Sequence, residues 1–193
     1  MASYVSAITK AYNKEGLITV IKHFPGHGSA TGNSHVDAIA SDATREEFES
    51  IHLVPFQAGI DAGAEGVIVG HIVANAYDPK HPGSSSTKVI EQLLREQMGF
   101  KGLVVSDAVE MTAARMESGA LGSATAQEAA DTAVACLKAG CDLLLSTSTL
   151  KRQLVIVDTI VSAVKSGEVP LSRLNEAVLR VLELKARHGL LTQ

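Results

Sequence analysis

Titratable side chains gather in one short stretch of the chain. Lys22, His23 and His27 stand among two glycines and a proline, and a polar loop then leads to His35. A short apolar run at 17–21 comes directly before them. In parallel α/β enzymes, the loops that follow the strands carry the chemistry. Because histidine titrates near neutral pH, this stretch is a candidate for proton transfer or ligand binding.

A second candidate is Asp107, which follows the apolar run 103–106. A carboxylate at a strand end is rigidly placed and partly desolvated, which suits catalysis, although a capping or loop-anchoring role fits the same position. His71 ends another apolar run in the same way. His27 could instead pin its loop by hydrogen bonds, and His35 taken alone could be a surface histidine. The remaining histidines are interpreted as structural: His52, His81 and His188.

Several common chemistries lack their motifs. The spacing of His23 with His27 and with Asp37 falls on a glycine-proline loop, so it is not diagnostic of a metal site. The sequence has no Gly-x-Ser-x-Gly elbow, Walker-type phosphate loop or dinucleotide fingerprint. We therefore expect neither a metal nor an organic cofactor.

The composition is that of an ordinary globular protein, with 193 residues, 46% hydrophobic residues and a net charge of -4. The mixed charges form no basic stripe, which argues against nucleic acid as a partner. No apolar run is long enough to span a membrane, and the first residues show no signal pattern, which favours a cytoplasmic location. Cys136 and Cys141 lack metal-ligand spacing and are expected to be buried thiols in a reducing compartment.

Strand-like and helix-like patterns alternate along the chain, which predicts parallel strands joined by crossover helices. Long loops are expected at 22–42 and 72–86, and Pro55 should kink the helix that contains it. Two architectures fit: a small open sheet covered on both faces, or half of an eight-stranded barrel. The predicted strands are 17–21, 66–70, 103–106 and 141–145, and the predicted helices are 3–15, 44–62, 87–98, 125–139, 150–166 and 171–187.

Four motifs together resemble glycoside hydrolase family 3, most closely its β-N-acetylglucosaminidase (β-N-acetylhexosaminidase) branch. They are Lys-His-Phe-Pro-Gly-His-Gly at 22–28, Gly-Val-Ile-Val-Gly-His-Ile at 66–72, the segment 99–111 around Ser-Asp-Ala-Val-Glu-Met, and Ala-Gly-Cys-Asp-Leu-Leu-Leu at 139–145, followed by an arginine-rich helix around Arg180. The resemblance implies an α/β fold of the (β/α)8 TIM-barrel type, of which these motifs match the last four βα units. Residues 1–193 would then be a single domain, a C-terminal half-barrel whose N-terminal half lies before Met1.

The resemblance also implies roles for individual residues. Asp107 matches the catalytic nucleophile, and His35 matches the general acid/base of the N-acetylglucosaminidase branch. The aspartate that normally stands two residues before that histidine is Asn33 here. An amide orients the ring but does not stabilise the imidazolium by charge, so we expect a lower histidine pKa and a weaker acid/base. Matched substrate-binding positions are Lys22, His23, His71 and Met111.

The function implied is a retaining glycosidase that removes terminal β-linked N-acetylglucosamine, from cell-wall or chitin-type amino sugars as in peptidoglycan turnover. The alternatives are a β-glucosidase or β-xylosidase of the same family, and a catalytically inactive half-barrel that serves as a binding or scaffold piece. The expected partners are a small carbohydrate and a missing N-terminal half or a second copy, because the strands at 17–21 and 141–145 would each keep an unpaired edge.

Overall fold

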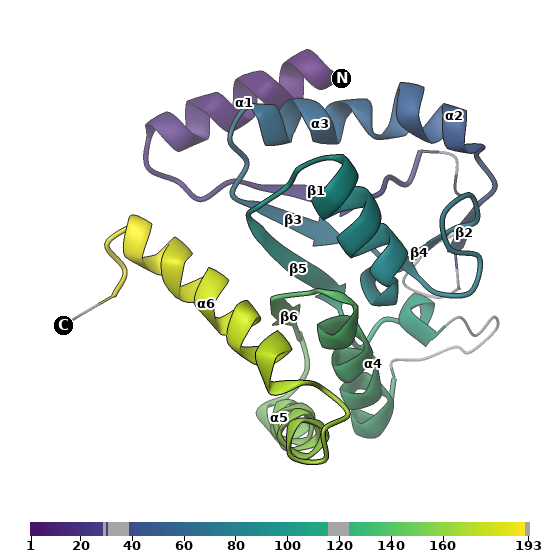
Figure 1. Ribbon diagram of the computed structural model, residues 1–193, viewed down its shortest axis with the longest axis vertical. Helices are drawn as coiled ribbons and strands as arrows, with labels where there is room; N and C mark the ends of the chain where they lie inside the picture. The colour runs from purple at the N-terminus through teal and green to yellow at the C-terminus, as the bar shows by residue number, and fades with distance from the viewer. Residues whose placement is uncertain (29, 31–38, 116–123, 192–193) are drawn as a thin grey trace.

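The computed structural model describes residues 1–28, 30, 39–115 and 124–191, with the side chains of Thr112 and Arg115 left out. A four-stranded sheet lies at its centre, in the order β1-β3-β5-β6, and every neighbouring pair is parallel. Its strands are β1 (Val20–Phe24), β3 (Gly66–Val69), β5 (Leu103–Ala108) and β6 (Leu143–Leu145). The predicted parallel α/β arrangement is confirmed (Figure 1).

Two strand predictions need correction. The first strand lies about three residues later than the apolar run at 17–21, so Lys22 and His23 belong to β1 itself rather than to the loop after it. The segments β2 (Ile39–Ser41) and β4 (Ile72–Ala74), expected to be loop, form a separate two-stranded parallel sheet. Strands of three residues are too short to show an alternating pattern, which is why the sequence did not reveal them. In Figure 1 this small sheet lies beyond the arrowheads of the main sheet.

The predicted helix 44–62 is divided into three parts. Thr44 caps α2 (Arg45–Glu47) with a reciprocal capping box, the π-helical turn η1 (Phe48–His52) follows, and α3 (Val54–Asp61) then begins. Pro55 lies in the first turn of α3, where a missing N–H costs no hydrogen bond. The proline therefore marks a helix start.

The other helices lie close to their predicted positions. They are α1 (Ala2–Lys14), the π-helix η3 (Lys88–Gln97), α4 (Ala126–Ala139), α5 (Leu150–Lys165) and α6 (Leu171–Arg187), with short 3-10 turns η2 (Gly83–Ser85) and η4 (Thr112–Arg115). Among the described residues, the helices include none with the length and apolar content that crossing a membrane requires. Cys136 and Cys141 are buried free thiols, as predicted.

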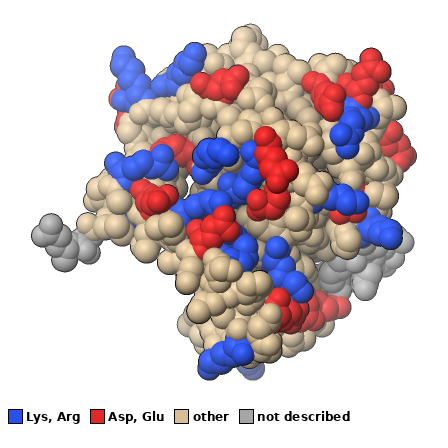
Figure 2. All heavy atoms as spheres, viewed as in Figure 1, with Lys and Arg blue, Asp and Glu red and all other residues tan. Residues whose placement is uncertain are grey.

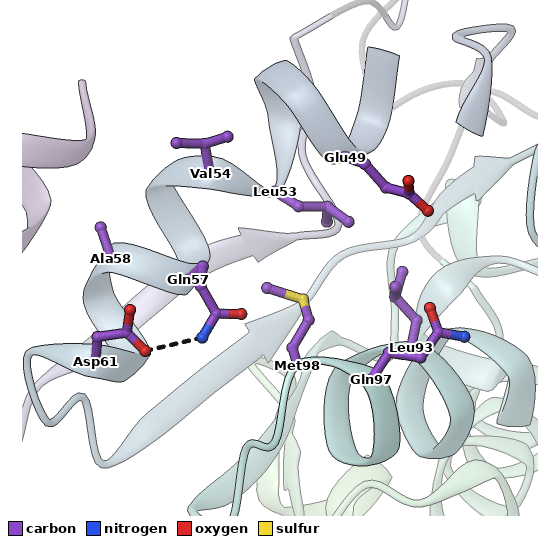
Figure 3. A pocket seen from close by; sticks show the side chains of 9 residues that line it. All are labelled: Glu49, Leu53, Val54, Gln57, Ala58, Asp61, Leu93, Gln97 and Met98. Carbon is purple, nitrogen blue, oxygen red and sulfur yellow. Dashed lines mark hydrogen bonds between the residues drawn. The ribbon is translucent and has the colours of Figure 1, made fainter. Parts of the chain in front are cut away.

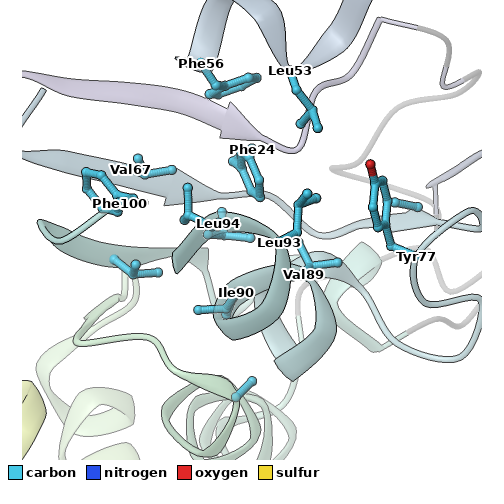
Figure 4. Close-up of a cluster of buried hydrophobic side chains, with 14 of the residues drawn as sticks. Phe24, Leu53, Phe56, Val67, Tyr77, Val89, Ile90, Leu93, Leu94 and Phe100 are labelled. Atoms are coloured by element: carbon cyan, nitrogen blue, oxygen red, sulfur yellow. The ribbon is translucent and has the colours of Figure 1, made fainter. Parts of the chain in front are cut away.

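The main core fills the space between the sheet and the helices η1, α3, η3 and α4. Figure 4 shows Phe24 of β1 between Leu53 and Phe56 on one side and the aliphatic side chains of η3 on the other. The rings of Phe24 and Phe56 meet edge to face with centroids 5.2 Å apart. Burying a phenylalanine side chain contributes about 1.5–3 kcal/mol, so this contact anchors the strand end that carries His23.

The helix α6 crosses the amino ends of the strands. The carboxylate of Asp142, just before β6, accepts hydrogen bonds from Arg173 and Arg180 of α6 at 2.6 and 2.9 Å. Leu184 packs against Leu103 and Val105 of β5. The α6 helix therefore closes the sheet at the end opposite its carboxyl edge (Figure 1). Figure 2, in the same view as Figure 1, shows acidic and basic side chains interspersed on the face turned to the viewer.

The outer strands β1 and β6 each have one neighbour among the described residues. Apolar side chains remain accessible on them: Val20 is 42% exposed, Leu143 44% and Leu145 38%. A closed barrel would cover such side chains and pair both edges. These accessible edges and side chains are what part of a barrel would leave uncovered.

Candidate active site

The polar residues predicted at the strand ends do converge at the carboxyl edge of the main sheet. His23 comes from β1, Asp107 from β5, and His71 follows β3, which lies between them. The Nε2 atom of His23 lies 3.6 Å from Oδ2 of Asp107, and these side chains are 29% and 16% exposed. A half-buried carboxylate thus sits beside an imidazole, with access from solvent.

Strand pairing on both sides holds Asp107 in place. Ser106 is in register with Val69 of β3, and Ala108 is in register with Leu145 of β6. The Oδ1 atom of Asp107 accepts the N–H of Ala108 at 2.9 Å. Its second oxygen, Oδ2, faces His23. A carboxylate oriented through one oxygen in this way can present the other to an electrophilic carbon.

Electrostatics favour a neutral His23. Partial burial lowers the pKa of His23, the negative charge of Asp107 raises it, and the nearby Lys22, His27 and His71 lower it further; the net shift is downward. The His27 ring lies edge-on to His23 with centroids 5.5 Å apart. A neutral imidazole offers one donor and one acceptor, the combination that suits a hydroxyl group.

His71 is almost completely buried, with 1% of its surface exposed. Its Nδ1 lies 2.6 Å from Oγ of Ser84, and its Nε2 lies 2.9 Å from the carbonyl oxygen of Ala108. Burial lowers the pKa of His71, although the Ala108 carbonyl and the charge of Asp107 act in the opposite direction. Both ring nitrogens are therefore engaged within the protein.

Lys22 and Met111 lie at the margin of the site. Lys22 is exposed and borders a hollow of about 600 Å³ between α1 and β1. Met111 is partly buried, and its N–H donates to the carbonyl of Ala108 at 3.0 Å. Their predicted contacts with substrate, like that of His71, stay predictions.

Sequence reasoning missed two side chains that shape this edge. The buried carboxylate of Glu110 accepts hydrogen bonds from Oγ of Ser146 and, at 3.3 Å, from the N–H of Thr147, which joins the ends of β5 and β6. Burial raises the pKa of Glu110, but hydrogen bonds from Ser146, Ser148 and Thr147 outweigh it, so the pKa is lowered. Ser84 is the second. The sequence offered a signal for Glu110, because this acidic residue stands only three residues after Asp107. It offered none for Ser84, which stands in a run of serines typical of loops.

His35 and Asn33 lie outside the described residues, and their predicted acid/base pairing stays a prediction. The described segments on either side of them belong to the site. His27 lies beside His23, and Ile39 pairs with Ile72, the residue after His71. His27 and Ile39 thus both lie next to strand ends that carry site residues.

A second hollow is lined by none of His23, His71 and Asp107. This hollow, of about 500 Å³, opens between α3 and η3 on the helical side of the sheet (Figure 3). Its polar side chains include Gln57, whose amide donates to Asp61 at 2.9 Å. Within the described part of the chain, His, Cys, Asp and Glu side chains form no group of three or more that could hold a metal ion.

Fold and site together define a partial barrel of parallel strands with a carboxylate and two histidines at its carboxyl edge. Residues 1–184 match the model of the glycosyl hydrolase family 3 N terminal domain, and the chain belongs to this family. The barrel-type fold predicted from the motifs, with only part of the barrel in this chain, is confirmed.

Individual relatives agree with this assignment. A protein named beta-hexosaminidase from Xanthomonas oryzae pv. oryzae is 38% identical over 145 residues, which are 75% of this chain and 40% of that protein. The solved structure of a family 3 beta-N-acetylglucosaminidase from Paenibacillus sp. str. FPU-7 superposes with a TM-score of 0.86 at 33% identity, over 96% of this chain and 34% of its own. A beta-N-acetylhexosaminidase from Beutenbergia cavernae DSM 12333 gives a TM-score of 0.78 at 31% identity, over 96% and 52% of the two chains. The chain therefore spans about 40% of the length of the curated relatives it matches.

Proposed function

We propose that this chain supplies the nucleophile side of a retaining glycoside hydrolase that releases terminal β-linked N-acetylglucosamine. The observation that carries the proposal is the Asp107 carboxylate, anchored through Oδ1 and facing His23 through Oδ2 at the carboxyl edge of the sheet. The names of the relatives, beta-hexosaminidase and beta-N-acetylglucosaminidase, support the amino sugar as substrate.

The reaction has two steps. In the first, Oδ2 of Asp107 attacks the anomeric carbon, the bond from that carbon to the leaving oxygen breaks, and His35 gives a proton to that oxygen. In the second, water attacks the same carbon, its proton passes to His35, and the bond to Asp107 breaks. Two inversions give net retention. Lys22 and the neutral His23 bind sugar hydroxyls, and Asn33 leaves the imidazolium of His35 without a compensating charge.

The test is hydrolysis of 4-nitrophenyl N-acetyl-β-glucosaminide, with NMR of the first-formed anomer. We expect the β anomer, a glycosylated Asp107 peptide in mass spectrometry with a slow fluorinated substrate, and loss of turnover in Asp107→Asn. Asp158→Asn, an exposed aspartate on α5, is the matched control and should keep full activity. Release of the α anomer, or turnover that survives Asp107→Asn, would overturn the proposal.

A second candidate is a catalytically inactive half-barrel that binds carbohydrate. It is favoured by Asn33, at the position where the family branch carries an aspartate, and by β1 and β6, each of which pairs with one strand in the described part of the chain. Saturable binding of N-acetylglucosamine without hydrolysis, both by this chain and by a full-length protein that contains it, would select this candidate. A preference for nitrophenyl glucoside or xyloside would select a neutral-sugar activity of the same family instead.

A further inference from the structure

The turn η2 is packed tightly behind the carboxyl edge of the sheet. The N–H of Ser84 donates to the carbonyl of Gly70 at 3.2 Å, and the Ser84 side chain is buried. At Gly83, an added Cβ would lie 3.2 Å from the Gly70 oxygen and 3.4 Å from Cδ of Pro25. The turn thus packs against both the end of β3 and the loop that follows β1. This packing restricts where the hydroxyl of Ser84 can lie.

The hydrogen bonds of His71 define its tautomer. The carbonyl oxygen of Ala108, 2.9 Å away, can only accept, so Nε2 of His71 must carry the proton. In a neutral ring Nδ1 is then an acceptor, and the Ser84 hydroxyl donates to it over 2.6 Å. The Ala108 carbonyl therefore fixes which nitrogen of His71 is the donor, and the Ser84 hydroxyl donates to the other nitrogen.

His71 makes a hydrogen bond to Ala108, and Ala108 in turn makes a hydrogen bond to the carboxylate of Asp107. The N–H of Ala108 donates to Oδ1 of Asp107, while the carbonyl of Ala108 accepts from His71 and from the N–H of Met111. Both polar backbone groups of Ala108 are thus occupied, one by the carboxylate and the other by its support. The His71 contact holds the 108–109 peptide, which meets the 107–108 peptide at the Cα of Ala108, and the N–H of that second peptide orients Asp107.

We propose that Ser84 and His71 are positioning residues, which act through Ala108 to hold the Asp107 carboxylate in its attacking orientation. This inference rests on the proposed role of Asp107 and replaces, for His71, the predicted contact with substrate. The hydroxyl of Ser84 donates a hydrogen bond to Nδ1 of His71, Nε2–H of the ring donates one to the carbonyl of Ala108, and the N–H of Ala108 donates one to Oδ1 of Asp107. No covalent step is assigned to either residue.

The first measurement uses the unaltered protein and requires no activity. Long-range ¹H–¹⁵N correlation spectra of its histidine rings, assigned by the loss of one ring in His71→Gln, should show His71 as the neutral Nε2–H tautomer at pH 7. An Nδ1–H tautomer or an imidazolium at this pH would overturn the proposal.

The second measurement compares Ser84→Ala with Ser85→Ala. Ser85 lies in the same turn, and its hydroxyl bonds only the nearby carbonyl of Pro82, at 3.3 Å, among the contacts described. Losing a buried hydrogen bond should speed amide exchange at Ala108 and Met111 by about tenfold in Ser84→Ala, with Val104 and Val105 unchanged. Equal acceleration along all of β5 would indicate a purely structural role and refute the proposal, as would no change at Ala108.

A kinetic readout separates this inference from the proposed function. In a protein that hydrolyses the nitrophenyl substrate, Ser84→Ala should lower kcat by about tenfold or more with KM within twofold, because a misaligned nucleophile affects the chemical step. Ser85→Ala should leave both unchanged. If the wild type does not hydrolyse the substrate, the proposed function fails, and the ring tautomer and the exchange pattern still decide whether Ser84 and His71 hold Ala108.

Discussion

The replacement Asp142→Asn tests how the fold is held at the amino ends of the strands. The Asp142 side chain is completely buried and accepts hydrogen bonds from Arg95, Arg173 and Arg180, at 2.7, 2.6 and 2.9 Å. Its Oδ2 also accepts the N–H of Val104, in β5, at 3.0 Å. One carboxylate therefore ties together β5, β6, η3 and α6.

The size of the effect follows from burial. Asparagine keeps the shape but removes the charge, so three guanidinium groups lose their shared partner. Breaking a buried pair in this way costs about 3–5 kcal/mol, a large share of the roughly 5–15 kcal/mol that stabilises a typical domain. The exposed pair Lys138–Glu168, whose side chains are 45% and 54% exposed, is the matched control. Glu168→Gln should cost about 0–1 kcal/mol.

The assay is urea denaturation followed by circular dichroism, with the midpoint and slope fitted for each variant. We expect a midpoint far below wild type for Asp142→Asn and a midpoint close to wild type for Glu168→Gln. Equal midpoints for the two variants would refute the reasoning, because burial would then not distinguish the two carboxylates. The site lies at the opposite edge of the sheet, so the substrate affinity of any folded Asp142→Asn protein should stay that of the wild type.

Three further predictions concern pH, assembly and the acid/base loop. Burial lowers the pKa of His23 and His71 in the folded state, so the unfolded chain binds more protons than the folded one as pH falls below about 6.5. Thermal melts should therefore show that stability decreases from pH 7.5 to 5.5. Constant stability across this window would contradict the lowered pKa values. The 193-residue polypeptide, expressed by itself, should self-associate in sedimentation experiments through the outer edges of β1 and β6, which have no further neighbour among the described residues. Leu143→Lys should reduce this association and Ile51→Lys, on η1, should not; a monodisperse wild-type monomer would argue against it. Asn33→Asp, in a protein with a completed barrel, should raise turnover of substrates with poor leaving groups, and an unchanged or lower rate would refute the proposed pairing with the loop histidine.

Local signals determined much of the fold. The capping boxes at Thr44 and Thr125 each rest on a glutamate three residues later, so α2 and α4 begin where the sequence indicates. The alternation of apolar runs and amphipathic runs was sufficient to predict parallel strands and the edge at which Asp107, His23 and His71 meet. Motifs read from the sequence alone also identified the family.

Tertiary structure decided which of these residues touch and what each can do. The boundaries of β1 depend on pairing with β3, and the three-residue strands β2 and β4 exist only because they pair with each other. Ser84 reaches His71 across 13 residues, and Ser146 reaches Glu110 across 36. A serine has the same local pattern whether its hydroxyl faces water or a buried imidazole, and only chain packing distinguishes the two. The sequence by itself therefore determined where the proposed nucleophile Asp107 stands, while packing determined which side chains contact it.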